Sequence, residues 1–235
     1  MTILRKYKIG HDYIDDIANS KDKDQFVKWL PGIGNSKGIR CAKFHLIKDE
    51  GPAFIILVTR EINHKHYNPW DDIIDFGSSK IYYWGDAKHS IVKNYMDFDG
   101  NKALMVVYEN YLDGNNFKVP PILHFSKKKT GTISFNGVCI ITNVETTWFQ
   151  DMQKPVKNLR FELSILDAEE VNVKWLLNRA NSSSKEHIDN RLAPKAWDSF
   201  LHGKINKLTL IKKEILNREN QLPGNNSYEA EILLN

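Results

Sequence analysis

Residues 121–141 read PILHFSKKKTGTISFNGVCII and contain three short apolar runs rich in β-branched and aromatic residues. Runs of this length, bounded by turn-forming residues, are typical of buried β-strands. Apolar runs of the same kind recur elsewhere in the chain, at residues 54–59, 80–84 and 103–109. The stretch therefore predicts a fold that is built mainly from β-strands.

The order of strands and turns narrows the fold class further. Residues 159–166 alternate apolar and polar side chains, as a half-buried strand does. Turn sequences separate the strand-like runs, at residues 98–101, 113–116 and 135–137. We expect an α+β fold, a twisted, antiparallel-rich sheet or open barrel with flanking helices and a C-terminal helical segment.

The pattern changes to helical spacing from Val171 onward, and Pro194 opens a second helical stretch with apolar residues up to Leu216. Residues Gln221 to Asn226 are typical of a linker, and the residues after them start like a helix. We therefore expect three parts, namely a sheet-rich domain over 1–180, a helical extension over 181–220, and a linker or the start of a missing module over 221–235.

The composition is that of an ordinary globular protein, with 41% hydrophobic and 26% charged residues among 235. A net charge of +4 and a pI of about 8.8 permit a polyanionic partner without requiring one. Two distant cysteines, Cys41 and Cys139, indicate neither a zinc site nor a disulfide framework. The chain shows neither a membrane-length apolar run nor a signal-peptide core, so we expect no membrane partner and a cytoplasmic location.

Residues 68–86 mix acidic and aromatic side chains, and they say most about function. A pocket for a flat, hydrogen-bonding ring needs aromatic faces for stacking and carboxylates that accept from an exocyclic amine. Taken singly, each aromatic residue is more often a core residue, and each aspartate more often caps a turn. If residues 82–84 form a strand, Tyr82 and Trp84 share one face and Tyr83 takes the other. The candidate base-binding residues are Trp70, Asp71, Asp72, Tyr82, Tyr83, Trp84 and Asp86.

Two alternative functions fit the same residues. A metal-dependent nuclease of the PD-(D/E)xK type would use Asp71 and Asp86 with Lys88 beside the metal. That pattern is short, and the segment after Trp84 leaves its strand instead of continuing it. A protein–protein interaction module with an aromatic groove is the third hypothesis.

Polar and basic side chains in several segments are candidates for contact with a DNA backbone. A glycine-rich loop at residues 32–38 exposes backbone N–H groups that suit phosphate, although it lacks the P-loop pattern. Three lysines at 127–129 occupy an expected hairpin tip, where solvated charge is the usual explanation. The candidate backbone contacts are Asn35, Lys37, Arg40, Lys88, Lys127, Lys128 and Lys129.

The order of these segments resembles that of one protein family. The segments are the glycine loop at 30–40, the acidic segment at 70–77, and the runs at 81–86, 120–125, 134–137 and 158–167. They resemble the N-terminal recognition domain of AspBHI/MspJI-type modification-dependent restriction endonucleases, over roughly residues 28–180. Domains of this type are similar to SRA (SET and RING-associated) domains, which flip 5-methylcytosine out of the duplex.

The resemblance implies an SRA-like fold and a partner, double-stranded DNA with 5-methylcytosine or a related modified cytosine, bound by base flipping. Trp70 and Tyr82 would stack on the flipped base. Asp71 or Asp72 would accept a hydrogen bond from the cytosine edge, with Asp86 as a further candidate.

The resemblance also bears on catalysis and partners. Family members join the recognition domain to a nuclease, and no catalytic core is recognised after residue 185. We therefore expect a non-catalytic chain with neither metal nor cofactor, where Mg²⁺ belongs only to an associated nuclease module. That module would be joined covalently or bind as a separate partner, and a homo-oligomer is also compatible with the resemblance.

Overall fold

The computed structural model describes residues 5–15, 29–30, 33, 38–46, 51–60, 70–87, 94–150, 155–184 and 188–205. The strands are β1 (Lys6–Lys8), β2 (Asp12–Asp15), β3 (Ile39–Lys43), β4 (Pro52–Arg60), β5 (Ile73–Asp75), β6 (Lys80–Trp84), β7 (Ile122–Lys129), β8 (Gly131–Gln150), β9 (Pro155–Ile165) and β10 (Glu170–Asn172). The helices are α1 (Asp99–Leu112), α2 (Val173–Ala180) and α3 (Lys195–Leu201), with short 3-10 helices η1 (Tyr95–Asp97) and η2 (Asn116–Lys118).

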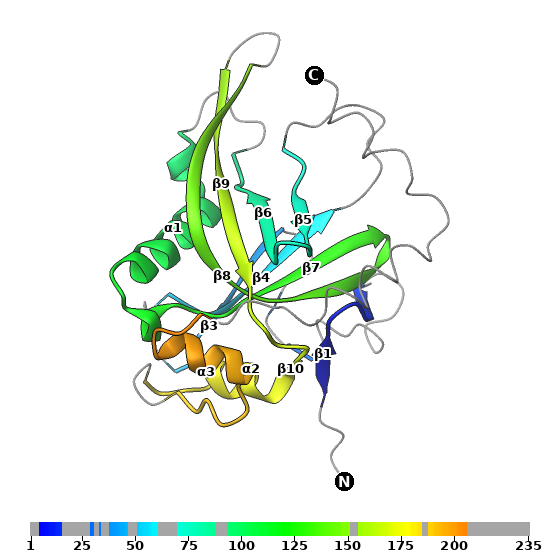
Figure 1. Ribbon diagram of the computed structural model, residues 1–235, viewed down its shortest axis with the longest axis vertical. Coiled ribbons are helices and arrows are strands. Elements are labelled where there is room, and N and C mark those ends of the chain that lie inside the picture. Colours follow the sequence, from blue (N-terminus) through cyan, green and yellow to red (C-terminus); the bar gives the residue numbers. More distant parts are fainter. Residues whose placement is uncertain are drawn as a thin grey trace.

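One large mixed sheet forms the centre of the fold (Figure 1). Its strands follow the order β3-β4-β7-β8-β9-β6-β5, and β2 pairs with β8 beside this path. Strands β4 and β7 are parallel, and the other pairs are antiparallel. The sheet is not closed into a barrel, and β1 and β10 form a separate two-stranded sheet. The predicted α+β class is confirmed.

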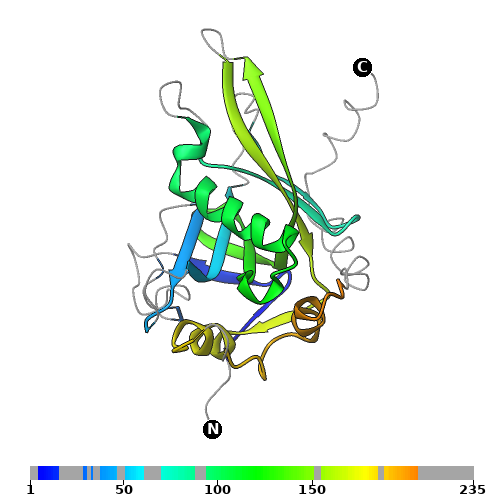
Figure 2. The same ribbon diagram turned by 90° about the vertical axis from the view of Figure 1, so that its left-hand side faces the viewer.

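Strand β8 connects most of this sheet, because it pairs with β2 and β7 in its first half and with β9 from Cys139 to its end. The pairing of β9 with β6 begins only at Arg160. Before that residue, β9 pairs with β8 alone, and the two strands project from the rest of the sheet (Figures 1 and 2). We call residues 145–150 and 155–160 the β8–β9 arm.

The segment Phe135-Asn136-Gly137 forms a β-bulge inside β8, and the predicted turn at this place was wrong. Gly137 pairs with His124. The next pair joins Phe135 to Phe125, so Asn136 is the extra residue of the bulged strand. Asn-Gly is as suited to a bulge as to a hairpin turn, because glycine adopts backbone angles that other residues avoid.

Residues 103–109 belong to helix α1, so the strand predicted there was also wrong. Leu104 and Val107 are buried three residues apart, whereas Val106 is 53% exposed. This burial follows the helical period. A short apolar run with branched side chains does not by itself distinguish a strand from a buried helix segment.

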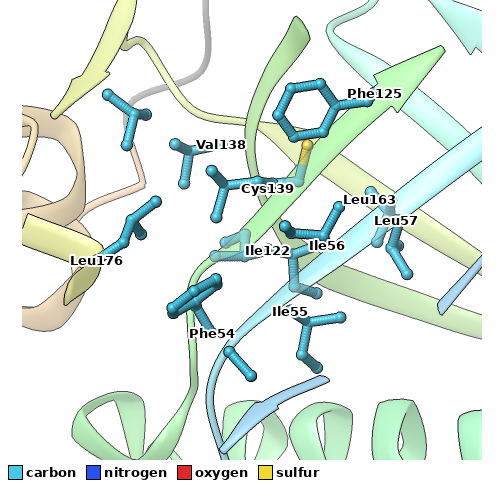
Figure 3. Packing of buried hydrophobic residues seen from close by; sticks show 14 of the residues in the cluster. Phe54, Ile55, Ile56, Leu57, Ile122, Phe125, Val138, Cys139, Leu163 and Leu176 are labelled. Atoms are coloured by element: carbon cyan, nitrogen blue, oxygen red, sulfur yellow. The ribbon is translucent and has the colours of Figure 1, made fainter. Parts of the chain in front are cut away.

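The other strand predictions are confirmed by β4, β6, β7, β8 and β9. Their side chains build the main hydrophobic core, which Figure 3 shows with Ile56 from β4, Ile122 from β7 and Cys139 from β8 close together. Leu176 of helix α2 belongs to the same core. The core fills the middle of the sheet, and the candidate site lies at the ends of β4 and β6.

The predicted C-terminal helices are confirmed in part. Helices α2 and α3 lie in the expected stretches, and Trp175 and Trp197 pack with ring centroids 5.8 Å apart. Helix α3 ends at Leu201, and residues after 205 lie outside the described part of the chain. The division at residue 180 stays a prediction. No helix within the described ranges is both long and apolar enough to span a membrane.

Gly137 gives a test of the bulge. Its φ is 135°, and a Cβ there would lie 2.7 Å from Cγ2 of Ile165. Gly137→Ala combines backbone strain with a steric clash, so we expect the free energy of unfolding to fall by roughly 3 kcal/mol or more. Gly114→Ala is the matched control, because Gly114 has φ 71° and nothing within 4 Å of the added Cβ. Urea denaturation of both variants measures the difference, and equal losses would contradict a steric role for Gly137.

Candidate functional site

Two tryptophans from the acidic–aromatic block pack against each other. Trp70 precedes β5 and Trp84 ends β6, and their ring centroids lie 4.9 Å apart at 71°. Val156 of β9 completes this small cluster, in which both tryptophans are buried. The indole Nε1 of Trp84 donates to the backbone carbonyl of Asp71 at 3.0 Å. These contacts fix the chain before β5 against the end of β6.

The three aromatic residues of β6 alternate between two faces, as the sequence predicted. The guanidinium of Arg160 lies 5.2 Å from the ring centre of Tyr82 and 5.8 Å from that of Trp84. Tyr83 points the other way, where a Cβ on Gly38 would come within 2.7 Å of its phenol oxygen. Of the four predicted rings, only that of Tyr82 is not fully buried.

Burial raises the pKa of Tyr83 well above its ordinary value, and the negative charges of Asp72 and Asp86 add to this effect. The phenol therefore stays protonated at any physiological pH. Its ring meets that of His124 edge-on, with centroids 6.1 Å apart. Because β6 and β7 are not neighbours in the sheet, this contact shows that the sheet curls so that its two parts face each other.

Asp72 has both carboxylate oxygens engaged. Its Oδ1 accepts from the backbone N–H of Trp84 at 2.8 Å. Its Oδ2 accepts from the hydroxyl of Thr59, at the end of β4, also at 2.8 Å. These two hydrogen bonds hold the carboxylate in one orientation, and the residue as a whole is partly exposed. Its neighbour Asp71 is exposed.

Behind Asp72 lies a series of buried polar side chains, which we call the Asp72 network. His124 Nε2 lies 3.0 Å from Thr59 Oγ1, and His124 Nδ1 lies 2.9 Å from the side-chain nitrogen of Asn136. Asn136 also donates to Ser126 Oγ at 2.6 Å. His124 is fully buried, and Thr59, Asn136 and Ser126 are each at most 4% exposed.

Burial lowers the pKa of His124 to about 3, so the imidazole is neutral at physiological pH. None of these four residues was predicted from sequence. The available signal was the presence of single polar residues inside otherwise apolar strands.

Asp86 lies against the start of helix α1. Its backbone N–H donates to Asn101 Oδ1 at 2.7 Å, and Asn101 donates in turn to the carbonyl of Tyr95. A Cβ on Gly100 would meet the Asp86 carboxylate, so that group lies against the first turn of the helix. A carboxylate in this position interacts favourably with the helix dipole. The arrangement gives Asp86 a structural role, and its predicted contact with the base edge stays a prediction.

The predicted backbone contacts fall into three groups. Arg40 is buried beside Asp15, with Nη2 and Oδ2 3.6 Å apart, and Lys127 lies 3.3 Å from the same oxygen. Asp15 thus pairs with both cations, and the burial of Arg40 in this pair weakens the case for Arg40 at a phosphate. Lys129 is exposed beside the β7–β8 turn, as the predicted hairpin tip requires. Asn35, Lys37, Lys88 and the side chain of Lys128 lie outside the described residues.

The β8–β9 arm carries aromatic and basic side chains that the sequence analysis did not single out. Trp148 is 62% exposed, and it pairs across the arm with Lys157. The ammonium of Lys157 lies 5.1 Å from the ring of Trp148 and 4.7 Å from that of Tyr95. A projecting two-stranded ribbon with an exposed ring and a cation has features that suit contact with a nucleic acid.

The metal-site hypothesis receives no further support from the described part of the chain. There, no three His, Cys, Asp or Glu side chains come together closely enough to hold a metal ion. The nuclease reading with Asp71, Asp86 and Lys88 stays a hypothesis, with Lys88 outside the described residues.

The fold and the site define the chain as an α+β domain with a curled mixed sheet and an acidic–aromatic cluster at the end of β6. The family model for the restriction endonuclease AspBHI N-terminal domain matches residues 7–212. The chain belongs to this family, and its match extends past residue 180.

Solved structures agree with this assignment. The DNA modification-dependent restriction endonuclease AspBHI superimposes with a TM-score of 0.71 and 23% identity, over 87% of this chain and 52% of that chain. MspJI restriction endonuclease, in complex with a 27-mer oligonucleotide, gives 0.74 and 19%, over 88% and 55%. The DNA recognition domain of the cytosine modification-dependent restriction endonuclease LpnPI gives 0.70 and 23%, over 87% and 92%.

These likenesses confirm the predicted SRA-like fold of the family, and at such identities they concern the fold alone. The chain spans about half the length of AspBHI and MspJI. Among characterised proteins compared by sequence, none matches the chain.

The depressed pKa of His124 predicts a pH dependence of stability. Below the ordinary value of 6.5, the unfolded chain binds a proton at His124 that the folded chain excludes until the pH reaches about 3. Stability from the neutral ring is therefore complete above 6.5 and lost as the pH falls, by about 1.4 kcal/mol per pH unit at most. His124→Gln should lack this component, so its free energy of unfolding should fall less steeply between pH 6 and pH 4 than that of wild type.

Urea denaturation at several pH values measures the two slopes. Both proteins have the same carboxyl groups, so the contribution of these groups to the slopes cancels in the comparison. His202→Gln serves as a control, because His202 is exposed. Parallel slopes for wild type and His124→Gln would contradict the assignment of a buried, neutral imidazole.

Proposed function

We propose that this chain binds double-stranded DNA containing 5-methylcytosine, or a related modified cytosine, by flipping the modified base out of the duplex. It would act as the recognition domain of a modification-dependent restriction endonuclease. Cleavage would come from a nuclease module in the same polypeptide or in a partner. Family membership supports the proposal, as does the LpnPI relative, which is described as a DNA recognition domain and of which 92% is covered.

The observation that carries the proposal is the fixed carboxylate of Asp72 beside the aromatic group of β6. A flipped cytosine needs an acceptor for its exocyclic amine and a ring to stack on. The two hydrogen bonds of Asp72 orient its oxygens, and the residue is partly exposed, so a ligand can approach it. Tyr82 offers the most accessible ring of the group. We therefore assign Asp72, rather than the exposed Asp71, to the base edge, and Tyr82 to stacking.

Trp70 has a supporting role in this assignment. It is 3% exposed and packs edge-on against Trp84, so it fixes the segment that carries Asp72. The guanidinium of Arg160 lies over one face of each of the rings of Tyr82 and Trp84, and it pairs with Glu145 at 2.5 Å. A guanidinium plane stacks on a base as readily as on a ring, so Arg160 joins the residues that would contact the extruded base.

The binding free energy at the site must offset the free-energy cost of taking the base out of the duplex. Extruding a base costs a few kcal/mol, which stacking and hydrogen bonds to the base edge return. The methyl group adds about 0.8 kcal/mol of apolar contact, which is about a fourfold preference. A rigid site is needed to turn so small a difference in free energy into a binding preference, because a mobile carboxylate or ring would adapt to either base.

The β8–β9 arm would contact the duplex itself. A two-stranded ribbon fits the major groove, and the exposed Trp148 and the cation of Lys157 suit a base face and a phosphate. Lys129 at the β7–β8 turn would add attraction for phosphates, together with the predicted contacts Asn35, Lys37, Lys88 and Lys128.

Titration of the chain with matched methylated and unmethylated duplexes tests the proposal. We expect tighter binding of the methylated duplex and, with 2-aminopurine beside the modified cytosine, a rise in fluorescence as the base leaves the stack. Tyr82→Ala should weaken binding of the methylated duplex by about 1–3 kcal/mol through lost stacking, whereas Tyr82→Phe retains the ring. Asp72→Asn should lower the methyl preference, whereas Asp71→Asn should leave it unchanged.

Two results would count against these assignments. Equal affinity of the wild-type chain for both duplexes would overturn recognition of the modified base. A loss of preference in Asp71→Asn with none in Asp72→Asn would move the reading role to Asp71. Circular dichroism melting of each variant confirms that folding is retained.

The arm gives a separate prediction. Trp148→Ala should weaken binding to methylated and unmethylated duplexes equally, and Lys157→Ala should lower the slope of log K against log salt by about one unit. Phe117→Ala is the matched control, because Phe117 is an aromatic residue with similar exposure, 59%, away from the arm. Unchanged affinity and salt slope for both arm variants would exclude the arm from the DNA contact.

A further inference from the structure

The chemistry of the side chains in the Asp72 network determines which group donates and which accepts in each hydrogen bond. An ionised carboxylate only accepts, so the hydroxyl hydrogen of Thr59 points to Asp72 Oδ2. The oxygen of Thr59 must then accept from His124, which places the imidazole hydrogen on Nε2. His124 Nδ1 is consequently the acceptor for the amide of Asn136.

The far end of the network is fixed by the bulge in β8. Asn136 is the extra residue of that bulge, and its side chain reaches both His124 and Ser126 of β7. Its two amide hydrogens are thereby both donated. In a regular strand, successive side chains alternate between faces, so the bulge is what places Asn136 where it can orient His124.

Such a network adds little to the stability of a core. Buried polar groups lose their hydration, and apolar side chains of similar volume would fill the same space with equal or greater stability. Four buried polar side chains from β4, β7 and β8 nevertheless lead to the carboxylate of one partly exposed aspartate. The arrangement is therefore better explained by the position of that carboxylate than by stability.

We propose that Thr59 and His124 are positioning residues, which hold the Asp72 carboxylate in the single orientation that distinguishes modified from unmodified cytosine. This inference rests on the proposed function. Thr59 fixes one oxygen from β4, and the N–H of Trp84 fixes the other from β6, so the carboxylate plane is set by two strands that are not neighbours in the sheet. His124, locked as the Nε2–H tautomer, prevents the Thr59 hydroxyl from turning away from Asp72.

The test compares isosteric variants of Thr59. Thr59→Val removes the hydroxyl and keeps the shape, so the ratio of dissociation constants for unmethylated and methylated duplexes should fall to within about twofold of one, because Asp72 loses its fixed orientation. Affinity for the unmethylated duplex should change by less than about twofold, since phosphate contacts supply it. Thr59→Ser restores the hydroxyl and should restore the ratio.

Thr142→Val is the matched control. Thr142 of β8 also bonds within the sheet, to Ser164 at 3.0 Å, without touching the Asp72 network. Its ratio should stay at the wild-type value. A wild-type ratio in folded Thr59→Val overturns the inference while leaving the proposed function intact, whereas a ratio of one in the wild-type chain is a failure of the proposed function itself.

A second measurement does not depend on how the variants fold. Nitrogen-15 NMR of labelled histidine in the wild-type chain reports which ring nitrogen of His124 carries the hydrogen. The inference requires the neutral Nε2–H tautomer with Nδ1 unprotonated. A neutral Nδ1–H tautomer would reverse the direction of the network and refute the role assigned to His124.

Discussion

The pairing of strand β8 is the constraint on which the remaining structure depends. Within its 20 residues it pairs with β7 on one side, and with β2 and then β9 on the other. Cys139 pairs with Ile122 of β7 and with Ile165 of β9, so the two parts of the large sheet meet at this strand. The bulge at Asn136 keeps the strand continuous while changing which side chains face the core. Beyond the core, the same strand provides half of the projecting arm.

The curl of the sheet then brings distant strands together at one place. Thr59 of β4 and Trp84 of β6 both bond to the Asp72 carboxylate, although four strand pairings separate β4 from β6 along the sheet. The buried His124 and Tyr83 meet edge-on beside them. One partly exposed aspartate is thus held by hydrogen bonds from two strands that are not neighbours in the sheet. This combination distinguishes the cluster from an ordinary turn capped by aspartates.

Much of the fold followed from local patterns. Apolar runs of four to six residues predicted β4, β6, β7 and β8, and alternation of apolar and polar residues predicted β9, because both patterns are visible in the residues of the strand itself. The two errors came from patterns with two structural solutions. Branched residues around Val106 are compatible with a strand or a helix, and Asn136-Gly137 is compatible with a turn or a bulge.

The site was predictable only in part. The alternation of Tyr82 and Trp84 against Tyr83 follows from strand geometry, and the structure confirms it. The burial of Arg40 beside Asp15 could not be foreseen, since the ion pair joins strands far apart in sequence. The same holds for the distinction between Asp71 and Asp72, which are adjacent in sequence and differ only in what surrounds them.

By itself the sequence determined strands β4, β6, β7, β8 and β9, the facing of the β6 side chains and the family resemblance, because these properties reside in the order of neighbouring residues. Tertiary structure alone decided which carboxylate is held and which basic side chains remain exposed. It also decided that single polar residues of β4, β7 and β8 form one network. Hydrogen bonds act over about 3 Å, so their partners are chosen by the curl and register of the sheet and not by position along the chain.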